Sequence, residues 1–423
     1  MTEDYLHYIW KFQKFDHRNL KTIHAEIVEV KKPGTHNHDS GPDFNEANIY
    51  VDGTEWFGSV EIHIQTSDWA KHKHQDDRNY NNVILHVVYE HDQEIYNQNG
   101  ETIPTIALKE IIDHNAYFSY ERFLQKGGDR PCYNKVKNLP KLRIVSTLDE
   151  MLVNRMMRKS QFIQDMLLRT NQDWEQVFHQ LLFKYLGMKV NDIPMLDLAQ
   201  RTSYVLLQKN ADDLFRLEAM LFGQAGMLNE VILDEYHQKL RSEYLFQKQK
   251  HQFQSMTGAE WKFSRMRPPN FPTLRIAQIA AIYSSYQNLF QLIRDKAPVR
   301  HLQLVFSAEP SEYWTTHYSF NSESRGHKGN LGKVALQNII INVIAPFAFY
   351  YGRSIGDESF EDYAFLLLES IPGEDNKITR KYEDFQIGVI SAKDSQSLIQ
   401  LHDQLCEKKR CLNCKIGVSL LQS

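Results

Sequence analysis

The sequence predicts a mixed α+β protein, in which an N-terminal α/β domain is followed by a mostly α-helical region. Over roughly the first 110 residues, short β-branched and aromatic runs alternate with turn residues and with one or two helical patterns. From about residue 141 onward, apolar residues recur at intervals of three and four, which is the spacing of an amphipathic helix. We therefore expect three consecutive domains, over residues 1–125, 126–295 and 296–423.

The N-terminal elements are expected in the order helix, strand, hairpin, helix, strand, strand. Asp52-Gly53 is a hairpin turn signal between two of the strands. Thr66 or Ser67 would cap the second helix. The predicted elements are a helix over 4–15, strands over 27–30, 47–51 and 56–64, a helix over 69–74, and strands over 83–89 and 102–108.

The region over 141–295 is expected to be helical, with one helix ended by Gly187. The run from Pro268 to Pro272 interrupts this pattern, and a helical pattern resumes over 274–292. The last part of the chain is expected to be helical with loops. Its glycine-rich segment, residues 325–332, lacks the spacing of a P-loop.

Composition excludes several classes of protein. Hydrophobic residues make up 42% of the chain and charged residues 24%, which is typical of a globular protein. The net charge is only −4, so a nucleic-acid site would have to be a local basic patch. The N-terminus lacks the basic start and apolar core of a signal peptide, and the most apolar stretch, residues 334–350, is interrupted by polar residues. We expect a cytoplasmic protein that does not span a membrane.

The most informative residues are two acids and a histidine in the predicted hairpin. Asp43 stands where one strand begins, and Glu61 lies inside the next. Side chains opposed on antiparallel strands lie about 5 Å apart, so two carboxylates can share one divalent cation such as Mg²⁺ or Mn²⁺. His63 is two residues from Glu61 and points to the same face, where it would assist an attacking water. The alternatives are a turn aspartate and a solvent-facing strand.

This segment resembles the PD-(D/E)xK nuclease motif, with Pro42-Asp43 as its first half and Glu61-x-His63 as its second. That superfamily uses a helix, a three-stranded meander, a helix and another strand, close to the order expected here. The resemblance implies that Asp43 and Glu61 hold the metal ion and that the third residue acts on the water or the phosphate. The chain departs from the motif at this third position, where the superfamily usually has lysine.

Nearly the whole chain also resembles an uncharacterised bacterial family, catalogued as domain of unknown function 2851. This resemblance implies no activity. The segments that carry it are His36-x-x-x-Ser40-Gly41-Pro42-Asp43-Phe44, Gly58-Ser59-Val60-Glu61-Ile62-His63, Asn81-Asn82-Val83-Ile84-Leu85-His86-Val87 and Arg410-Cys411-Leu412-x-Cys414-x-Ile416-Gly417.

A second set of candidate ligands consists of histidines: His63, His72, His74 and His86. They could approach one another if the helix packs over the sheet. His72 and His74 are two apart on the predicted helix and would not share a face, so joint binding of zinc is not expected.

The chain has four cysteines, and three of them are spaced C-x4-C-x2-C near the end. They are Cys406, Cys411 and Cys414, and the fourth, Cys132, lies far upstream. Four thiolates suffice for a zinc ion or an iron–sulfur cluster. Such a centre would attach the chain end to the nuclease-like domain and resembles the iron–sulfur staple of some DNA end-processing nucleases. The alternative is four unbonded thiols.

A basic stretch over 239–275 contains interleaved aromatic residues, such as Tyr244, Phe246 and Trp261. Cations neutralise phosphates, and aromatic rings stack on bases. The alternative is a charged helix face with a buried aromatic stripe. The candidate nucleic-acid contacts are Lys248, Lys250, Lys262, Arg265 and Arg267.

These observations favour a metal-dependent, nuclease-like phosphodiesterase that acts on DNA or RNA. One alternative is a catalytically inactive nucleic-acid-binding or scaffold protein with a degenerate nuclease fold. The other is a zinc-dependent hydrolase of small molecules, built from the histidines.

Overall fold

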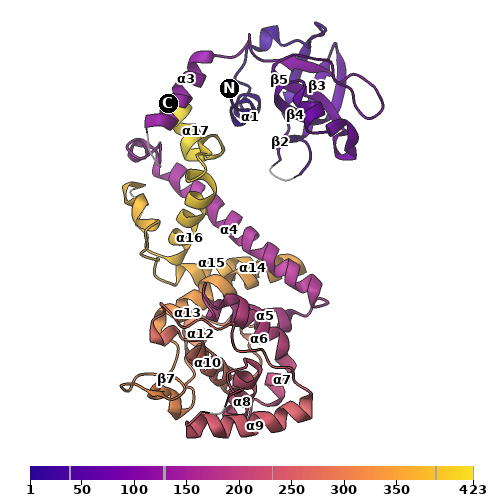
Figure 1. Ribbon diagram of the computed structural model, residues 1–423. Helices are drawn as coiled ribbons and strands as arrows, with labels where there is room; N and C mark the ends of the chain where they lie inside the picture. Colours follow the sequence, from indigo (N-terminus) through magenta and orange to yellow (C-terminus); the bar gives the residue numbers. More distant parts are fainter. Residues whose placement is uncertain (38–39, 127–129, 231, 386–387, 423) are drawn as a thin grey trace. The chain divides into compact units, whose positions relative to one another are not determined.

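The computed structural model describes residues 1–37, 40–126, 130–230, 232–385 and 388–422 (Figure 1). The chain forms two compact units, each with its own core. Unit 1 comprises Met1–Leu148, Lys381–Ile387 and Ile399–Ser423, and unit 2 comprises Asp149–Arg380 and Gly388–Leu398. These units do not follow the three consecutive ranges expected from the sequence, because the end of the chain packs with the beginning.

Unit 1 is built on a mixed sheet with the strand order β1-β3-β4-β5-β6, and β2 pairs with β3 (Figure 1). β1, β3 and β4 are antiparallel neighbours, whereas β5 runs parallel to β4 and β6 runs parallel to β5. The strands are β1 (Val28–Lys32), β2 (Thr35–His36), β3 (Phe44–Val51), β4 (Thr54–Gln65), β5 (Val83–Glu90) and β6 (Thr105–Ala107).

The predicted hairpin is confirmed. Val51 pairs with Thr54, and the two residues between them, Asp52 and Gly53, have φ of 45° and 79°. Positive φ at both central positions is the two-residue turn whose twist matches that of the flanking strands. The hairpin sets the register of β3 against β4 next to the turn. An irregularity between Phe44 and Ala47, where Glu46 has φ of 57°, shifts the register by one residue at the start of β3.

Helices and turns complete the N-terminal part of unit 1. The first helix ends earlier than expected, because Phe12 leaves the helix and Gln13 has φ of 50°. These elements are α1 (Glu3–Lys11), η1 (His17–Asn19), α2 (Asp68–Lys71), η2 (His74–Asp76), η3 (Arg78–Tyr80), α3 (His114–Lys126) and η4 (Val136–Asn138).

The predicted helix over 69–74 is wrong in its second half. α2 stops at Lys71, and Lys73 adopts the left-handed conformation, with φ of 61°. A residue with positive φ cannot continue a right-handed helix, whose residues all have φ of about −60°, so the chain leaves the helix before Lys73. His74 then begins a separate turn, and this break changes where the neighbouring histidines point.

The C-terminal segment belongs to unit 1. It consists of the end of α16 (Ala392–Leu401), η9 (His402–Cys406), η10 (Cys411–Asn413) and α17 (Lys415–Gln422). Leu412 is buried in the same core as Leu6, Trp10 and the sheet residues. The core therefore joins residues that are some 400 positions apart in the sequence.

Unit 2 is helical, as predicted, apart from the small hairpin of β7 (His317–Ser319) and β8 (Ser322–Glu323). Aspartates 173, 213 and 234 cap three of its helices by accepting a hydrogen bond from a backbone N–H of the first turn. Its elements are α4 (Lys141–Arg169, which begins in unit 1), α5 (Trp174–Leu186), α6 (Asp192–Arg201), α7 (Tyr204–Lys209), α8 (Leu214–Gln224), α9 (Glu235–His251), η5 (Pro268–Asn270), α10 (Pro272–Ser285), α11 (Gln291–Arg294), α12 (Val299–Phe306), η6 (Glu312–Thr315), α13 (Lys333–Ile339), η7 (Ile340–Ile344), α14 (Ala345–Ile355), α15 (Ser359–Glu369) and η8 (Thr379–Phe385, which ends in unit 1).

One helical run, Lys333–Ile355, is long and apolar enough to cross a membrane by length and composition. However, 61% of its most apolar window is buried inside the structure. A core helix of a soluble protein has this property, and the run belongs to the core of unit 2.

Candidate metal centre

Asp43 and Glu61 lie next to each other where β3 begins. Phe44 pairs with Val60 across the two strands, so Asp43, just before β3, lies beside Glu61, the next residue of β4. The N–H of Asp43 donates to Glu61 Oε2 at 3.1 Å, and the N–H of Ile62 donates to Asp43 Oδ2 at 2.9 Å. The structure therefore brings the two predicted acids together.

Glu61 is buried, with only 5% of its surface exposed. The solvent-facing strand considered as an alternative is thus wrong. Burial, together with the nearby charge of Asp43, raises the pKa of Glu61 to about 9. An unpaired buried carboxylate takes up a proton rather than remain charged, whereas a cation beside it favours the ionised form. This position therefore suits a cation.

Imidazole nitrogens surround the other oxygen of Glu61. Its Oε1 lies 3.3 Å from His74 Nε2 and 3.5 Å from His63 Nε2. His63 Nε2 in turn lies 3.1 Å from His72 Nδ1. One nitrogen of each of the three histidines falls within 4.8 Å of the others.

The expectation that His72 and His74 would not act together is corrected by this geometry. It assumed one continuous helix, in which residues two apart point in different directions. The left-handed Lys73 turns the chain between them, and both rings face His63, at centroid distances of 5.0 Å and 5.3 Å.

The spacing of these ligand atoms fits one metal ion. Two atoms bound to a tetrahedral ion at about 2.1 Å lie roughly 3.4 Å from each other. Three separations lie close to that value: 3.1 Å between His63 and His72, and 3.3 Å and 3.5 Å from Glu61 to His74 and His63. The ligand atoms that all lie within 4.8 Å of one another are those of the three histidines. The buried Nε2 of His74 also makes no hydrogen bond among the described residues, as expected of a nitrogen that serves a metal ion.

Residues around the histidines hold their rings in place. His86, on β5 beside Glu61, is fully buried, and its Nε2 lies 2.9 Å from His63 Nδ1. Tyr80 stacks on His74 with a centroid distance of 3.8 Å. Burial and the neighbouring imidazoles lower the pKa of His63 to about 4 and that of His86 well below its ordinary value. Both rings are therefore neutral, as metal ligation requires.

Asp43 has a different environment from Glu61. Burial opposes its ionisation, but hydrogen bonds from His7 and from the N–H of Ile62 keep its pKa below the ordinary value. His7 Nε2, on α1, lies 3.2 Å from Asp43 Oδ2, and the charge of Asp43 raises the pKa of His7 in spite of its burial. His7 was not predicted from the sequence, because nothing in the residue pattern around it links α1 to the hairpin.

The sequence profile of one family matches residues 3–377, a range that includes both carboxylates and all four histidines of the centre. It is described as a protein of unknown function, DUF2851. The chain belongs to the DUF2851 family. No curated protein matches the sequence, and no solved structure matches the fold.

The four cysteines of this DUF2851 protein all lie in unit 1, three of them outside the matched range. Burial, followed by the nearby thiols of Cys406, Cys414 and Cys411, raises the pKa of Cys132. Burial and the neighbouring thiols of Cys414 and Cys406 raise the pKa of Cys411 to about 12. The four thiols therefore lie near enough to one another to affect each other's ionisation. None of them forms a disulfide.

An aromatic and cationic group closes one side of this cysteine cluster. The guanidinium of Arg130 lies over Tyr382, 4.8 Å from the ring centroid. Tyr382 is fully buried, and its hydroxyl makes a hydrogen bond with Cys406. Gly417 lies so close to Cys411 that a Cβ would come within 2.1 Å of the Cys411 carbonyl oxygen. The segment that carries Cys411 and Cys414 is thus held tightly against α17.

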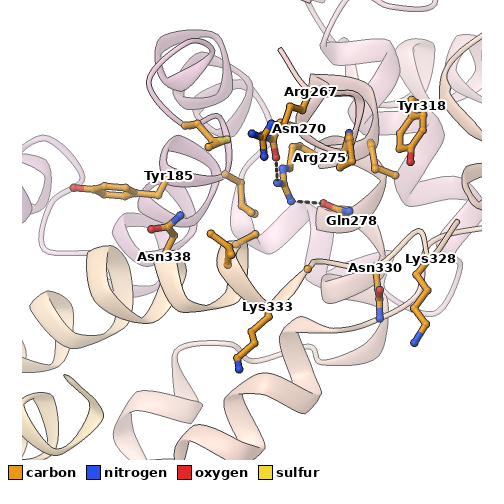
Figure 2. A pocket seen from close by; sticks show the side chains of 17 residues that line it. Tyr185, Arg267, Asn270, Arg275, Gln278, Tyr318, Lys328, Asn330, Lys333 and Asn338 are labelled. Carbon is orange, nitrogen blue, oxygen red and sulfur yellow. Dashed lines mark hydrogen bonds between the residues drawn. The ribbon is translucent and has the colours of Figure 1, made fainter. Parts of the chain in front are cut away.

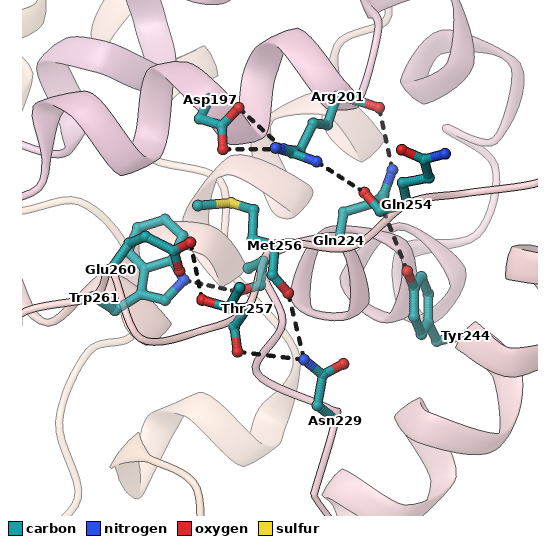
Figure 3. Close-up of polar contacts among 11 residues, drawn as sticks. Asp197, Arg201, Gln224, Asn229, Tyr244, Gln254, Met256, Thr257, Glu260 and Trp261 are labelled. Atoms are coloured by element: carbon teal, nitrogen blue, oxygen red, sulfur yellow. Dashed lines mark hydrogen bonds and ion pairs between the residues drawn. The ribbon is translucent and has the colours of Figure 1, made fainter.

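The basic stretch lies in unit 2, on α9 and on the segment that follows it. Figure 3 shows contacts that fix this segment: Asn229 Nδ2 donates to the carbonyl oxygens of Met256 and Thr257, each at 3.4 Å, and Arg201 Nη1 donates to Gln254 O at 3.2 Å. In addition, Trp261 Nε1 donates to Ala225 O at 2.7 Å. Tyr244 and Trp261 are buried, so their rings are core residues and do not offer a stacking surface, whereas Phe246 is 61% exposed.

The five candidate cations of that stretch are divided between α9 and the segment that follows it. Lys248 is half-buried on α9, and Lys250 is exposed near the end of the same helix. The other three, Lys262, Arg265 and Arg267, are exposed on the segment between α9 and α10.

Proposed function

We propose that unit 1 is a divalent-metal-dependent, nuclease-like phosphodiesterase acting on DNA or RNA. One observation carries the proposal: one nitrogen of each of His63, His72 and His74 lies within 4.8 Å of the others, and the buried Glu61 Oε1 lies 3.5 Å and 3.3 Å from the first and third of these histidines. A second carboxylate, Asp43, stands beside it. Imidazole ligands favour Mn²⁺ or Zn²⁺ over Mg²⁺, which prefers oxygen ligands.

The order of elements supports the nuclease-like reading. α1 is followed by the antiparallel strands β1, β3 and β4, then by α2, and then by β5 parallel to β4. This is the helix, meander, helix, strand order of the superfamily that the motif resembles. Asp43 precedes the middle strand of the meander and Glu61 lies in its last strand, as the resemblance requires.

The residues of the centre have different proposed roles, which follow from their different environments. A bound divalent ion would supply positive charge to a phosphodiester, where charge develops on attacking and leaving oxygens. Glu61, His63, His72 and His74 would hold that ion. Asp43, ionised and partly exposed, would accept a proton from the attacking water at its carboxylate.

The role expected of His63 is better assigned to His7. Both ring nitrogens of His63 face other imidazoles, at 2.9 Å and 3.1 Å, so neither is directed to a substrate. His7 has a raised pKa and lies beside Asp43, so it would supply the positive charge that a lysine supplies in the related motif. The exposed cations of unit 2 are the proposed contacts to the nucleic-acid backbone.

The test is cleavage of single- and double-stranded DNA and RNA by the full chain, with Mn²⁺, Zn²⁺ or Mg²⁺ added after chelation. Glu61→Gln should bind the ion at least tenfold more weakly and should lose metal-dependent cleavage. Glu55→Gln is the matched control, because Glu55 lies exposed on the same strand. Cleavage that persists in Glu61→Gln would remove this centre from the reaction.

A second candidate, a zinc-dependent hydrolase of small molecules, is favoured by the predominance of histidine among the ligands. Hydrolysis of a chromogenic phosphodiester, without cleavage of any polynucleotide, would support this candidate. The inactive, degenerate nuclease would instead show no binding of Mn²⁺ or Zn²⁺ at Glu61 and nucleic-acid binding that ignores the metal.

We also propose that Cys132, Cys406, Cys411 and Cys414 hold a zinc ion or an iron–sulfur cluster that joins the C-terminal segment to the rest of unit 1. The residues suit such a centre because all four are free thiols of unit 1, two of them buried and two half-buried, and nearby thiols raise the pKa of Cys132 and Cys411. Cys132 and Cys406 come from distant parts of the sequence, and both lie near Tyr382. The guanidinium of Arg130 lies over the ring of Tyr382.

A further inference from the structure

Unit 2 contains a cavity of about 390 Å³ (Figure 2). None of its described lining residues belongs to the proposed metal centre. Its wall is formed by the end of α5, the segment that leads into α10, the glycine-rich segment 325–332 and the first turns of α13. Gln278 on α10 joins two of these walls, because its Nε2 donates to the carbonyl of Gly329 at 2.7 Å.

The polar side of this cavity is positively charged. Four cations line it, Arg267, Arg275, Lys328 and Lys333, and no carboxylate is among its described lining residues. Figure 2 shows Arg267 and Arg275 together on one side and the two lysines on the other. Arg267, Lys328 and Lys333 are exposed, so solvent weakens their mutual repulsion, whereas Arg275 is buried. Together the four cations make the cavity attractive to an anion.

Arg275 is the strongest sign of a missing anion. Its side chain is 5% exposed, yet both of its paired nitrogens donate to neutral amides: Nη1 to Gln278 Oε1 at 2.8 Å and Nη2 to Asn270 Oδ1 at 2.7 Å (Figure 2). Its buried Nε makes no hydrogen bond among the described residues. Burial lowers the pKa of Arg275 to about 10. Buried charges are normally paired, because leaving a charge without a partner is costly.

The remainder of the wall is apolar and aromatic. Leu186, Leu274 and Val334 contribute aliphatic surface, and the rings of Tyr185 and Tyr318 lie at opposite ends of the site in Figure 2. A ligand that fits this cavity therefore combines an anionic group, which meets the cations, with flat or apolar surface, which meets the rings and aliphatic side chains. A volume of a few hundred Å³ is that of a small-molecule site.

We propose that this cavity binds the phosphate of a nucleotide-sized ligand, with Arg275 as the buried contact and with Arg267, Lys328 and Lys333 as contacts at its rim. Guanidinium groups bind phosphate oxygens through paired hydrogen bonds, and lysines add charge. The glycine-rich segment 325–332, which lacks P-loop spacing, contributes Lys328 and Asn330 by side chain and does not wrap the phosphate with its backbone.

Calorimetric titration of the full chain with AMP, adenosine and inorganic phosphate tests the proposal. AMP should bind at least tenfold more tightly than adenosine, and phosphate should compete with it. The triple variant Arg267→Gln, Lys328→Gln, Lys333→Gln, with all three changes on exposed side chains, should weaken AMP at least tenfold. Lys248→Gln combined with Lys250→Gln is the matched control, since neither lines the cavity, and should change AMP affinity less than twofold.

Arg275→Lys keeps the charge and loses the paired geometry, so it should weaken AMP binding while a circular dichroism spectrum stays unchanged. Each of three outcomes would overturn the proposal. The first is equal binding of AMP and adenosine, and the second is no binding of any of AMP, GMP, CMP or UMP. The third is unchanged AMP affinity in the triple variant. Displacement of AMP by a 5′-phosphorylated but not by a 5′-hydroxyl oligonucleotide would assign the phosphate to a strand end, and displacement by neither would assign it to a free nucleotide. Glu61→Gln should leave AMP binding unchanged, so this site and the metal centre can fail separately.

Discussion

At the scale of single residues, the proposed metal centre depends on how imidazoles are placed beside one carboxylate. Glu61 and His63 come from one strand, whereas His72 and His74 come from two short turns that a left-handed residue separates. Each histidine offers one nitrogen toward Glu61 or toward a neighbouring ring. The left-handed backbone of Lys73 therefore sets the directions in which His72 and His74 point.

His74→Ala should weaken binding of Zn²⁺ or Mn²⁺ by roughly ten- to a hundredfold, because it removes one of four ligand side chains. The measurement is a metal titration of the chelated full chain. His24→Ala is the control, since His24 is half exposed and lies outside the centre. Equal affinities in the two variants would show that His74 is not a ligand.

His179 in unit 2 supplies a pH-dependent prediction that does not involve the metal centre. This fully buried residue has Nε2 2.8 Å from the carbonyl of Thr202 and Nδ1 2.7 Å from the hydroxyl of Tyr283. Burial lowers the pKa of His179 to about 4, so the folded protein keeps it neutral where the unfolded chain already takes up a proton.

Because the folded pKa is the lower one, stability from neutral His179 is complete above about pH 6.5 and is lost as pH falls toward 4. The free energy of unfolding should fall by roughly 1.4 kcal/mol per pH unit over that window. In urea titrations, His179→Gln should be less stable than wild type at pH 7, and the gap should narrow as pH falls. A gap that stays constant with pH would contradict the prediction.

At the scale of elements, close helix packing in unit 2 depends on small residues. A Cβ on Gly223 of α8 would come within 2.1 Å of the ring of Tyr244 on α9. Since both lie in the core, the two helices could accept Gly223→Ala only by moving apart or by rotating a buried ring.

Gly223→Ala should therefore lower the free energy of unfolding by about 1–3 kcal/mol. Urea denaturation followed by circular dichroism measures the change. Gly326→Ala is the matched control, because its added Cβ would meet no atom within 4 Å and its φ is not positive. Similar losses in the two variants would show that the α8–α9 contact is not the cause.

The cysteine cluster acts on several elements at once, since it involves the segments before α4 and after α16. Cys411→Ser combined with Cys414→Ser should remove the metal measured by elemental analysis and should lower the midpoint of thermal unfolding. Absorbance near 400 nm in anaerobically prepared wild type distinguishes an iron–sulfur cluster from zinc. Wild type without bound zinc or iron at these cysteines would overturn the proposed centre.

At the scale of the whole molecule, the chain passes between its two units more than once. Unit 1 takes its last part from Ile399–Ser423, and Leu412 is buried with residues of α1 and the sheet. Each large apolar side chain buried in this way contributes about 1.5–3 kcal/mol. The sheet that carries the proposed metal centre thus depends on this C-terminal segment for part of its core.

Truncation after Leu398 should destabilise unit 1 selectively. Hydrogen exchange should become at least tenfold faster in α1, β3 and β4, while α5 and α10, which belong to the core of unit 2, should keep their protection. Uniform loss of protection in both units, or none in unit 1, would contradict the assignment of the C-terminal segment.

Much of the fold could be predicted because its signals are local. The hairpin at Asp52-Gly53, the strand over 83–89 and the helices of unit 2 follow from periodicity and turn chemistry within a few residues. The membership in the DUF2851 family likewise follows from sequence alone. Element ends were less predictable, because α1 and α2 are terminated by left-handed residues of ordinary type.

Local sequence determined that a two-residue turn joins β3 and β4. That turn alone would set Asp43 opposite Ile62, and an irregularity between Phe44 and Ala47, where Glu46 has φ of 57°, shifts the register so that Asp43 meets Glu61. Only the tertiary structure decided the rest of the centre: the turn at Lys73 that aims His72 and His74 at one point, the approach of His7 from α1, and the gathering of Cys132 with the C-terminal thiols. The physical reason is range. Backbone turns act over a few residues, whereas burial and charge pair side chains that are hundreds of positions apart.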